Sequence, residues 1–295
     1  SWIFASKIKT EKPKVTRTDF VTEGSDMLRM GIMLSLSSIT ALATSYLARI
    51  YISHRGGVEQ VGLFNAGFAI VNSYVGMVFT AMGTDYFPRL SSYIHDRIKA
   101  MNTVNNQAEI AILILAPIIT IFLVFIKWVV ILFYSTKFIG IHNMIHFAVL
   151  GMFFKAISWP ISYIFIAKGH TKLFFYSELI ANIYFLGFKI IGYRLGGLDG
   201  IGIAFLINFF LYFVQVYIIA KKKYDFSFTH EFSVIFRNQL IIGILCFLCV
   251  KLLEAPYLYI IGTILIMLSV WYSLKELNKR MNLILLIKEK YLKGK

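Results

Sequence analysis

Charge, and negative charge above all, is scarce in this sequence. Only 15% of its 295 residues are charged and just 15 residues are acidic, whereas 58% are hydrophobic. Soluble domains carry charge at about a quarter of their positions, so the composition excludes an ordinary soluble domain. The few carboxylates include no Asp-x-Asp pair that could hold a metal–nucleotide complex.

Cysteine and the signatures of catalysis are scarce as well. The two cysteines, Cys246 and Cys249, lie inside the apolar run 240–250. A reactive thiolate needs polar surroundings, so we interpret both as packing residues. His142 and His146 have the spacing of a zinc pair on a helix, but the glutamate of a metalloprotease motif is absent. No metal, no cofactor and no enzymatic active site are expected.

Long apolar runs, by contrast, are abundant. A membrane-spanning helix needs about 20 apolar residues, and eight segments meet this requirement. They do not alternate in polarity as the strands of an outer-membrane barrel do, so the expected fold is all-α and integral to the membrane. The predicted spans are 31–52, 59–82, 110–133, 144–167, 173–193, 199–220, 236–254 and 257–274.

The basic residues are concentrated in alternate connections between the spans. Five segments hold 22 of the 30 Lys and Arg residues, and basic loops remain in the cytoplasm. Both ends of the chain are therefore predicted to be cytoplasmic, and the net charge of +15 reflects topology and attraction to anionic membrane lipids rather than nucleic-acid binding. Within the second segment, Pro88 is expected to end a span and 89–106 to form a short surface helix. The five segments are 1–30, 83–109, 168–172, 221–238 and 275–295.

Six of the spans carry polar residues along one helical face. The residues recur at steps of 3, 4 or 7, or sums of these, which is the spacing of neighbours on a helix surface. Because hydrocarbon penalises such groups, the six faces should point at one another or at a watery cavity. In chain order the faces hold Ser35, Ser38, Ser45 and Arg49; Asn65, Asn72 and Gly76; Glu109, Thr120 and Lys127; Lys155, Ser158 and Ser162; Glu178, Asn182 and Lys189; Asn208, Tyr212 and Gln215.

Lys155 and Glu178 are the charged residues of most interest within these faces. Lys155 is predicted near the middle of the bilayer, where a lysine costs about 3 kcal/mol. Either it attracts an anionic substrate such as a diphosphate, or it pairs with Glu178 in an internal salt bridge. Glu178, the only carboxylate well inside a span, is either that partner or the site of proton or cation coupling.

The remaining candidates are one cation and three amides. Arg49 is expected either to bind phosphate through its guanidinium or to extend toward the lipid headgroups, as Lys127 and Lys189 also do in the second interpretation. The amides are expected either to hydrogen-bond sugar hydroxyls or to hold helices together. They are Asn72, Asn182 and Asn208.

Several segments resemble the second half of Wzx-type O-antigen flippases. These are YLARIYISHRGG, VGLFNAGFAI and the helix that closes with DYFPRLS, followed by GGLDGIGIAFLI and the final pair of spans. The resemblance covers essentially the whole chain and extends to the superfamily that includes lipid II flippases and multidrug extruders. The span 59–82 contains no Arg or Lys, unlike the cavity described for lipid II flippases, which disfavours that member.

This resemblance implies one lobe of a two-lobe transporter with 12 or 14 helices, in the bacterial inner membrane. It would move an undecaprenyl-diphosphate-linked oligosaccharide by alternating access, and its partners would be that substrate, membrane lipids and a missing N-terminal lobe. We expect 1–30 to be the end of a truncated span and a linker, 31–220 a six-helix lobe, and 221–295 two additional helices with a basic tail. The alternatives are a multidrug extruder of the same fold and a membrane-embedded polymerase or ligase, although the predicted outer loops are short for an enzyme.

Overall fold

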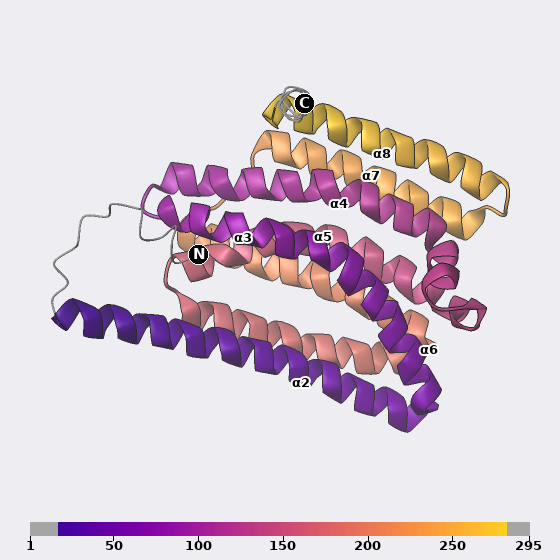
Figure 1. Ribbon diagram of the computed structural model, residues 1–295, viewed down its shortest axis with the longest axis horizontal. Coiled ribbons are helices and arrows are strands. Elements are labelled where there is room, and N and C mark those ends of the chain that lie inside the picture. Colours follow the sequence, from indigo (N-terminus) through magenta and orange to yellow (C-terminus); the bar gives the residue numbers. More distant parts are fainter. Residues whose placement is uncertain (1–16, 282–295) are drawn as a thin grey trace, which may run out of the picture.

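The chain folds into a bundle of long helices (Figure 1), in a computed structural model that describes residues 17–281. Within those residues there is no strand. The expectations for residues 1–16 and for the tail beyond residue 281 lie outside the described residues. The elements are α2 (Arg17–Ile70), the π-helix η1 (Val71–Val75), α3 (Gly76–Ser92), α4 (Arg97–Phe133), the 3₁₀ helix η2 (Thr136–Ile141), α5 (His142–Ala167), α6 (Thr171–Tyr224), α7 (His230–Leu252) and α8 (Tyr257–Met281).

Two of the helices, α2 and α6, are folded back on themselves. Each contains 54 residues, far more than the ~20 that one membrane crossing needs. The backbone of α2 leaves helical geometry at Gly57 (φ 78°), and that of α6 does so at Gly197 (φ 57°), a conformation that glycine adopts without penalty. The described residues contain six helical stretches long and apolar enough to cross a membrane. The two reversals divide two of these stretches, so the eight predicted spans are all helical.

The arms of α6 pack closely because glycines face each other across its reversal. A Cβ atom added to Gly192 would lie 2.4 Å from the Gly200 carbonyl oxygen, and one added to Gly200 would lie 1.9 Å from that of Gly192. The glycines at steps of four therefore serve both as a turn, at Gly196 and Gly197, and as a close helix contact.

The connection between α3 and α4 differs from the prediction. α3 continues through Pro88 to Ser92, and α4 begins at Arg97 and runs unbroken to Phe133. The predicted surface helix 89–106 is therefore wrong. Tyr86 explains the longer α3, since its fully buried hydroxyl donates to the Pro160 carbonyl oxygen of α5 at 2.7 Å and holds this turn against the bundle.

Asp96 marks the start of α4. Its side chain accepts a hydrogen bond from the Lys99 backbone N–H at 3.1 Å, as an N-cap does. This bond lowers the pKa of the Asp96 carboxyl. The first turns of α4 are then buried against neighbouring helices, with Asn105 only 2% exposed.

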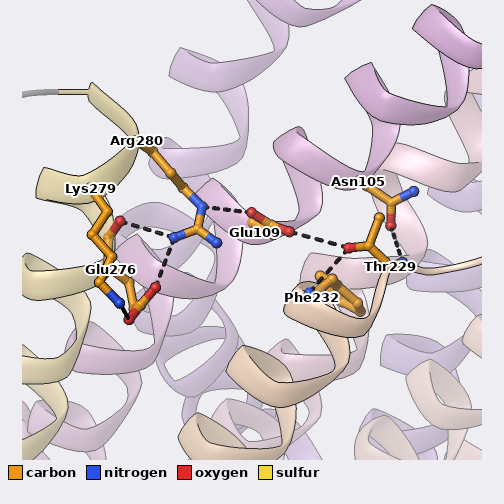
Figure 2. Close-up of polar contacts among 7 residues, drawn as sticks. All are labelled: Asn105, Glu109, Thr229, Phe232, Glu276, Lys279 and Arg280. Atoms are coloured by element: carbon orange, nitrogen blue, oxygen red, sulfur yellow. Dashed lines mark hydrogen bonds and ion pairs between the residues drawn. The ribbon is translucent and has the colours of Figure 1, made fainter.

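The last two helices are tied to α4 by a polar network at one end of the bundle (Figure 2). Arg280 of α8 donates from Nε to Glu109 Oε2 of α4 at 2.7 Å and from Nη1 to Glu276 Oε2 at 2.9 Å. The other Glu109 oxygen accepts from the Thr229 hydroxyl at 3.4 Å, and Asn105 Oδ1 accepts from the Thr229 N–H at 3.0 Å. Glu109, which was expected to face the shared cavity, instead joins α4 to the start of α7 and the end of α8.

Candidate functional site

The reversal of α6 brings the polar faces of two predicted spans against each other. Gln215 donates from its amide to the Ser177 carbonyl oxygen at 2.9 Å and to its Oγ at 2.7 Å. One turn away, the Tyr212 hydroxyl donates to the Glu178 carboxylate. Asn182 remains on its own helix, donating to the Glu178 backbone oxygen at 2.9 Å. Gln215 and Tyr212 therefore find their partners on the other arm of α6, as polar groups in hydrocarbon tend to do.

Glu178 lines a cavity of about 510 Å³ between α2, α3, α5 and α6. Ser37 and Ser38 of α2, Phe87 of α3 and Tyr163 of α5 form other parts of its wall. Ser38 and Glu178 belong to faces predicted from different spans, and the fold places both on one space. The cavity combines hydroxyl groups with a single carboxylate among aromatic rings.

Lys155 lies close to this region but does not form an ion pair with Glu178. Its Nζ lies 5.3 Å from the ring centroid of Phe79 and 5.4 Å from that of Phe209, which are cation–π distances. Among the described residues no ion pair joins Lys155 to Glu178, although the two groups interact electrostatically over a longer distance. In this conformation the ammonium group is therefore held by aromatic faces from two helices and is not neutralised by direct contact with a carboxylate.

Two further cations, Arg49 and Lys189, form a second cationic site further along the polar faces of α2 and α6. Arg49 donates from Nε to Asn65 Oδ1 at 2.9 Å, across the reversal of α2. Lys189 is 7% exposed, lies 3.9 Å from the Phe185 ring centroid and interacts electrostatically with Arg49. It does not extend to the surface, as one interpretation expected. Lys189 follows Glu178 by 11 residues on one helix, which places the two about 16 Å apart along the helix axis.

Two buried polar atoms in the described part of α6 have no hydrogen-bond partner. They are Asn208 Oδ1 and the Tyr184 hydroxyl. Asn208 is 5% exposed and precedes Tyr212 by one turn, and Tyr184 lies within electrostatic reach of Glu178. A buried group without a partner costs about 1–3 kcal/mol, so these atoms are suited to bind water or a ligand. Asn72, by contrast, is exposed in the π-helix η1, an irregularity that is frequent at functional sites.

The structure therefore brings some of the predicted residues together and leaves others apart. One buried region contains Glu178, Lys155 and Asn208. Arg49 lies apart from it, in the second cationic site with Lys189. Asn182 hydrogen-bonds to the backbone of its own helix. Sequence reasoning did not identify Tyr184, because a tyrosine in a span is most often a packing residue. The only available signal was its position between Asn182 and Lys189 on the same helix.

The chain is similar to known proteins in sequence and in fold. Residues 12–143 match a family described as polysaccharide biosynthesis protein. Among solved structures, a lipid II flippase, MurJ in an inward closed conformation, is similar over 96% of this chain with a TM-score of 0.60 and 15% identity. The predicted resemblance to polysaccharide flippases is confirmed. Comparison with curated protein sequences gives no match.

The structural match concerns the fold of the chain. The chain covers 59% of the length of the MurJ chain, and at 15% identity the likeness establishes the fold alone. The six apolar helical stretches of the described residues and this fold indicate a multi-pass membrane protein.

Proposed function

We propose that this chain forms one lobe of a flippase that moves a lipid-linked oligosaccharide across the bacterial inner membrane. The substrate would be an undecaprenyl-diphosphate-linked O-antigen unit or another surface polysaccharide unit, passed by alternating access of two lobes. The observation that carries the proposal is the set of buried polar atoms and lysines without a carboxylate partner along the arms of α6 and the adjoining α5. A charged headgroup needs such groups in place of the water that it leaves.

The residues are assigned roles by their surroundings. Arg49 and Lys189, which lack a carboxylate partner in the described residues, would bind the diphosphate when it is at their end of the passage. Lys155 would meet it near the middle. Asn208, with its free carbonyl oxygen, and Asn72 would hydrogen-bond sugar hydroxyls, and Asn182 would do so after release from its own helix. Glu178 would couple transport to a proton or a cation.

The packing of the last two helices supports the division of the chain that we propose. Residues 31–220 would form the six-helix lobe, while 221–295 would add two helices on its outside, since α7 and α8 pack on α4 and on each other. The helical part begins earlier than expected, because α2 starts at Arg17. An N-terminal lobe would face the polar side of α2, and both ends of this chain would lie in the cytoplasm.

The proposal is tested in cells that lack their own exporter and produce this lobe with its partner lobe. Lys155→Ala, Arg49→Gln and Lys189→Met should each reduce surface glycan by about tenfold or more, the loss expected when one charge-assisted hydrogen bond is removed. Lys137→Met changes an exposed lysine outside these clusters and should leave export unchanged. Normal export by all three of these lysine and arginine variants, at equal membrane levels, would contradict the proposal.

The same cells distinguish a multidrug extruder of this fold. A cationic drug favours an acidic site, but the buried cluster contains Lys155 and Lys189 against Glu178. Drug resistance that depends on Glu178 and is independent of glycan export would support the extruder.

A further inference from the structure

A second pocket lies where the turn between α7 and α8 meets the start of α5, outside the proposed passage. It has a volume of about 230 Å³ and its polar wall contains Lys127, His142, Asn143, His146 and Glu254. The turn is at the same end of the bundle as the reversal of α2 (Figure 1). This is the end predicted to face away from the cytoplasm.

The pocket presents opposite charges that do not neutralise each other. Lys127 and Glu254 both line it and both are exposed, and among the described residues no ion pair joins them. A second ammonium group is fixed nearby, since Lys251 Nζ donates to Asn143 Oδ1 at 2.6 Å. The amide of Asn143 in turn donates to Asp199 at 3.2 Å. The pocket therefore has an ammonium group and a carboxylate in its lining, with a second ammonium group nearby.

His146 adds a buried acceptor. The residue is 1% exposed, and its Nε2 lies 3.1 Å from the Leu123 carbonyl oxygen. A carbonyl oxygen only accepts hydrogen bonds, so Nε2 carries the proton and Nδ1 retains its lone pair. This Nδ1 is buried and has no partner among the described residues. A ligand with an N–H or O–H donor would satisfy it.

The aromatic residues around the pocket indicate its position along the membrane normal. Trp128 donates from Nε1 to the hydroxyl of Tyr259, which lines the pocket, at 3.0 Å, and Trp128 is 59% exposed. Tyr257, two residues away, is 66% exposed. Exposed Trp and Tyr residues mark the headgroup level of a bilayer. A lipid headgroup is therefore available to the pocket at this depth.

We propose that this pocket binds the headgroup of a phospholipid that carries both a phosphate and a primary ammonium, the phosphatidylethanolamine class. The phosphate would lie at Lys127 and Lys251, and the ammonium would donate to Glu254 and to His146 Nδ1. A quaternary ammonium has no N–H to donate to these acceptors. An anionic headgroup without an amine would leave them unpaired and would lie against the Glu254 carboxylate. The lipid would bridge α4 and α5 of the lobe to the turn between α7 and α8.

The test uses the purified chain in detergent with added short-chain lipids and counts retained lipids by native mass spectrometry. Phosphatidylethanolamine should be retained in preference to phosphatidylcholine and phosphatidylglycerol. Lys127→Met and Glu254→Gln should each reduce its retention about fivefold to tenfold, as expected for loss of a charge-assisted hydrogen bond. Both side chains are exposed, so neither change should disturb folding. Lys137→Met and Glu59→Gln alter exposed residues outside the pocket lining and serve as matched controls.

Three further outcomes decide the proposal. Displacement of the retained lipid by soluble phosphoethanolamine would support recognition of the headgroup itself. Equal retention of phosphatidylglycerol would show a simple anion site and would overturn the proposal, as would retention of phosphatidylethanolamine unchanged by Lys127→Met and Glu254→Gln. Because these readouts concern bound lipid and not export, they are independent of the proposed flippase activity.

Discussion

Tyr212 donates its hydroxyl to the Glu178 carboxylate across the reversal of α6. This bond joins the two arms of one long helix at the wall of the proposed passage. Glu178 therefore has a structural role, in holding the two arms together, beside the proposed role of its charge in transport. Different substitutions separate the two roles.

Glu178→Gln keeps an oxygen acceptor for Tyr212 and removes the charge. We expect the folded protein to be about as stable as the parent, while export falls to background if Glu178 couples transport. Thermal unfolding of the purified protein and surface glycan in cells measure the two quantities. Normal export by this variant would remove the coupling role.

Tyr212→Phe tests the structural role of the bond between Tyr212 and Glu178 while leaving the charge of Glu178 in place. It leaves the carboxylate without its donor, and hydrogen bonds to charged groups contribute about 1.5–3 kcal/mol, so the free energy of unfolding should fall by about that amount. Tyr217→Phe is the control, because Tyr217 packs by its ring against Phe228. Equal effects of the two changes on denaturant unfolding would contradict the role given to this bond.

The close approach of the α6 arms makes a steric prediction. Gly200→Ala would place a Cβ atom 1.9 Å from the Gly192 carbonyl oxygen, so the arms must separate and little folded protein should be recovered. Gly187→Ala is the matched control in the same helix, since nothing lies within 4 Å of a Cβ there. Size-exclusion yield after membrane extraction compares the two, and equal yields would show that the arms do not meet here.

Arg280 and Glu109 should be energetically coupled. Their side chains are 25% and 6% exposed, and removing one partner of a buried pair leaves the other uncompensated. A double-mutant cycle with Glu109→Gln and Arg280→Met should give a coupling free energy of about 1–3 kcal/mol. The same cycle on Arg97 and Asp225, a pair exposed on both sides, should give under about 1 kcal/mol. Equal couplings would argue against α8 being anchored through Glu109.

The fold was largely predictable from the sequence, because apolar length and polar spacing report directly on membrane crossing. The pairing of polar faces was also predictable in kind, as the bonds from Tyr212 to Glu178 and from Arg49 to Asn65 show. Each such group has only another polar face to satisfy it in hydrocarbon. Which faces pair with each other was not predictable. Glu109, for example, forms an ion pair with Arg280 and does not face the other polar residues.

The failures share one physical cause, which is long-range contact. Pro88 was expected to end a span, but the bond from Tyr86 to Pro160 on α5 holds α3 in place beyond it. The burial of Lys189 depends in part on Phe68 of α2, whose ring its ammonium group approaches although the two residues are far apart in the sequence. A single sequence contains no signal that brings such partners together.

The central claim is that the cavity beside Glu178 contains water, and cysteine accessibility tests it most directly. The experiment uses full-length protein in which Cys246 and Cys249 have been replaced. Ser38→Cys places a thiol on the cavity wall. Leu42→Cys, one helical turn further along α2, replaces a residue that is 59% exposed and does not line the cavity. We expect a membrane-impermeant thiol reagent to label Cys at position 38 in at least one transport state and to leave position 42 unlabelled. A position 38 closed to the reagent in every state, in protein that exports glycan normally, would contradict the account.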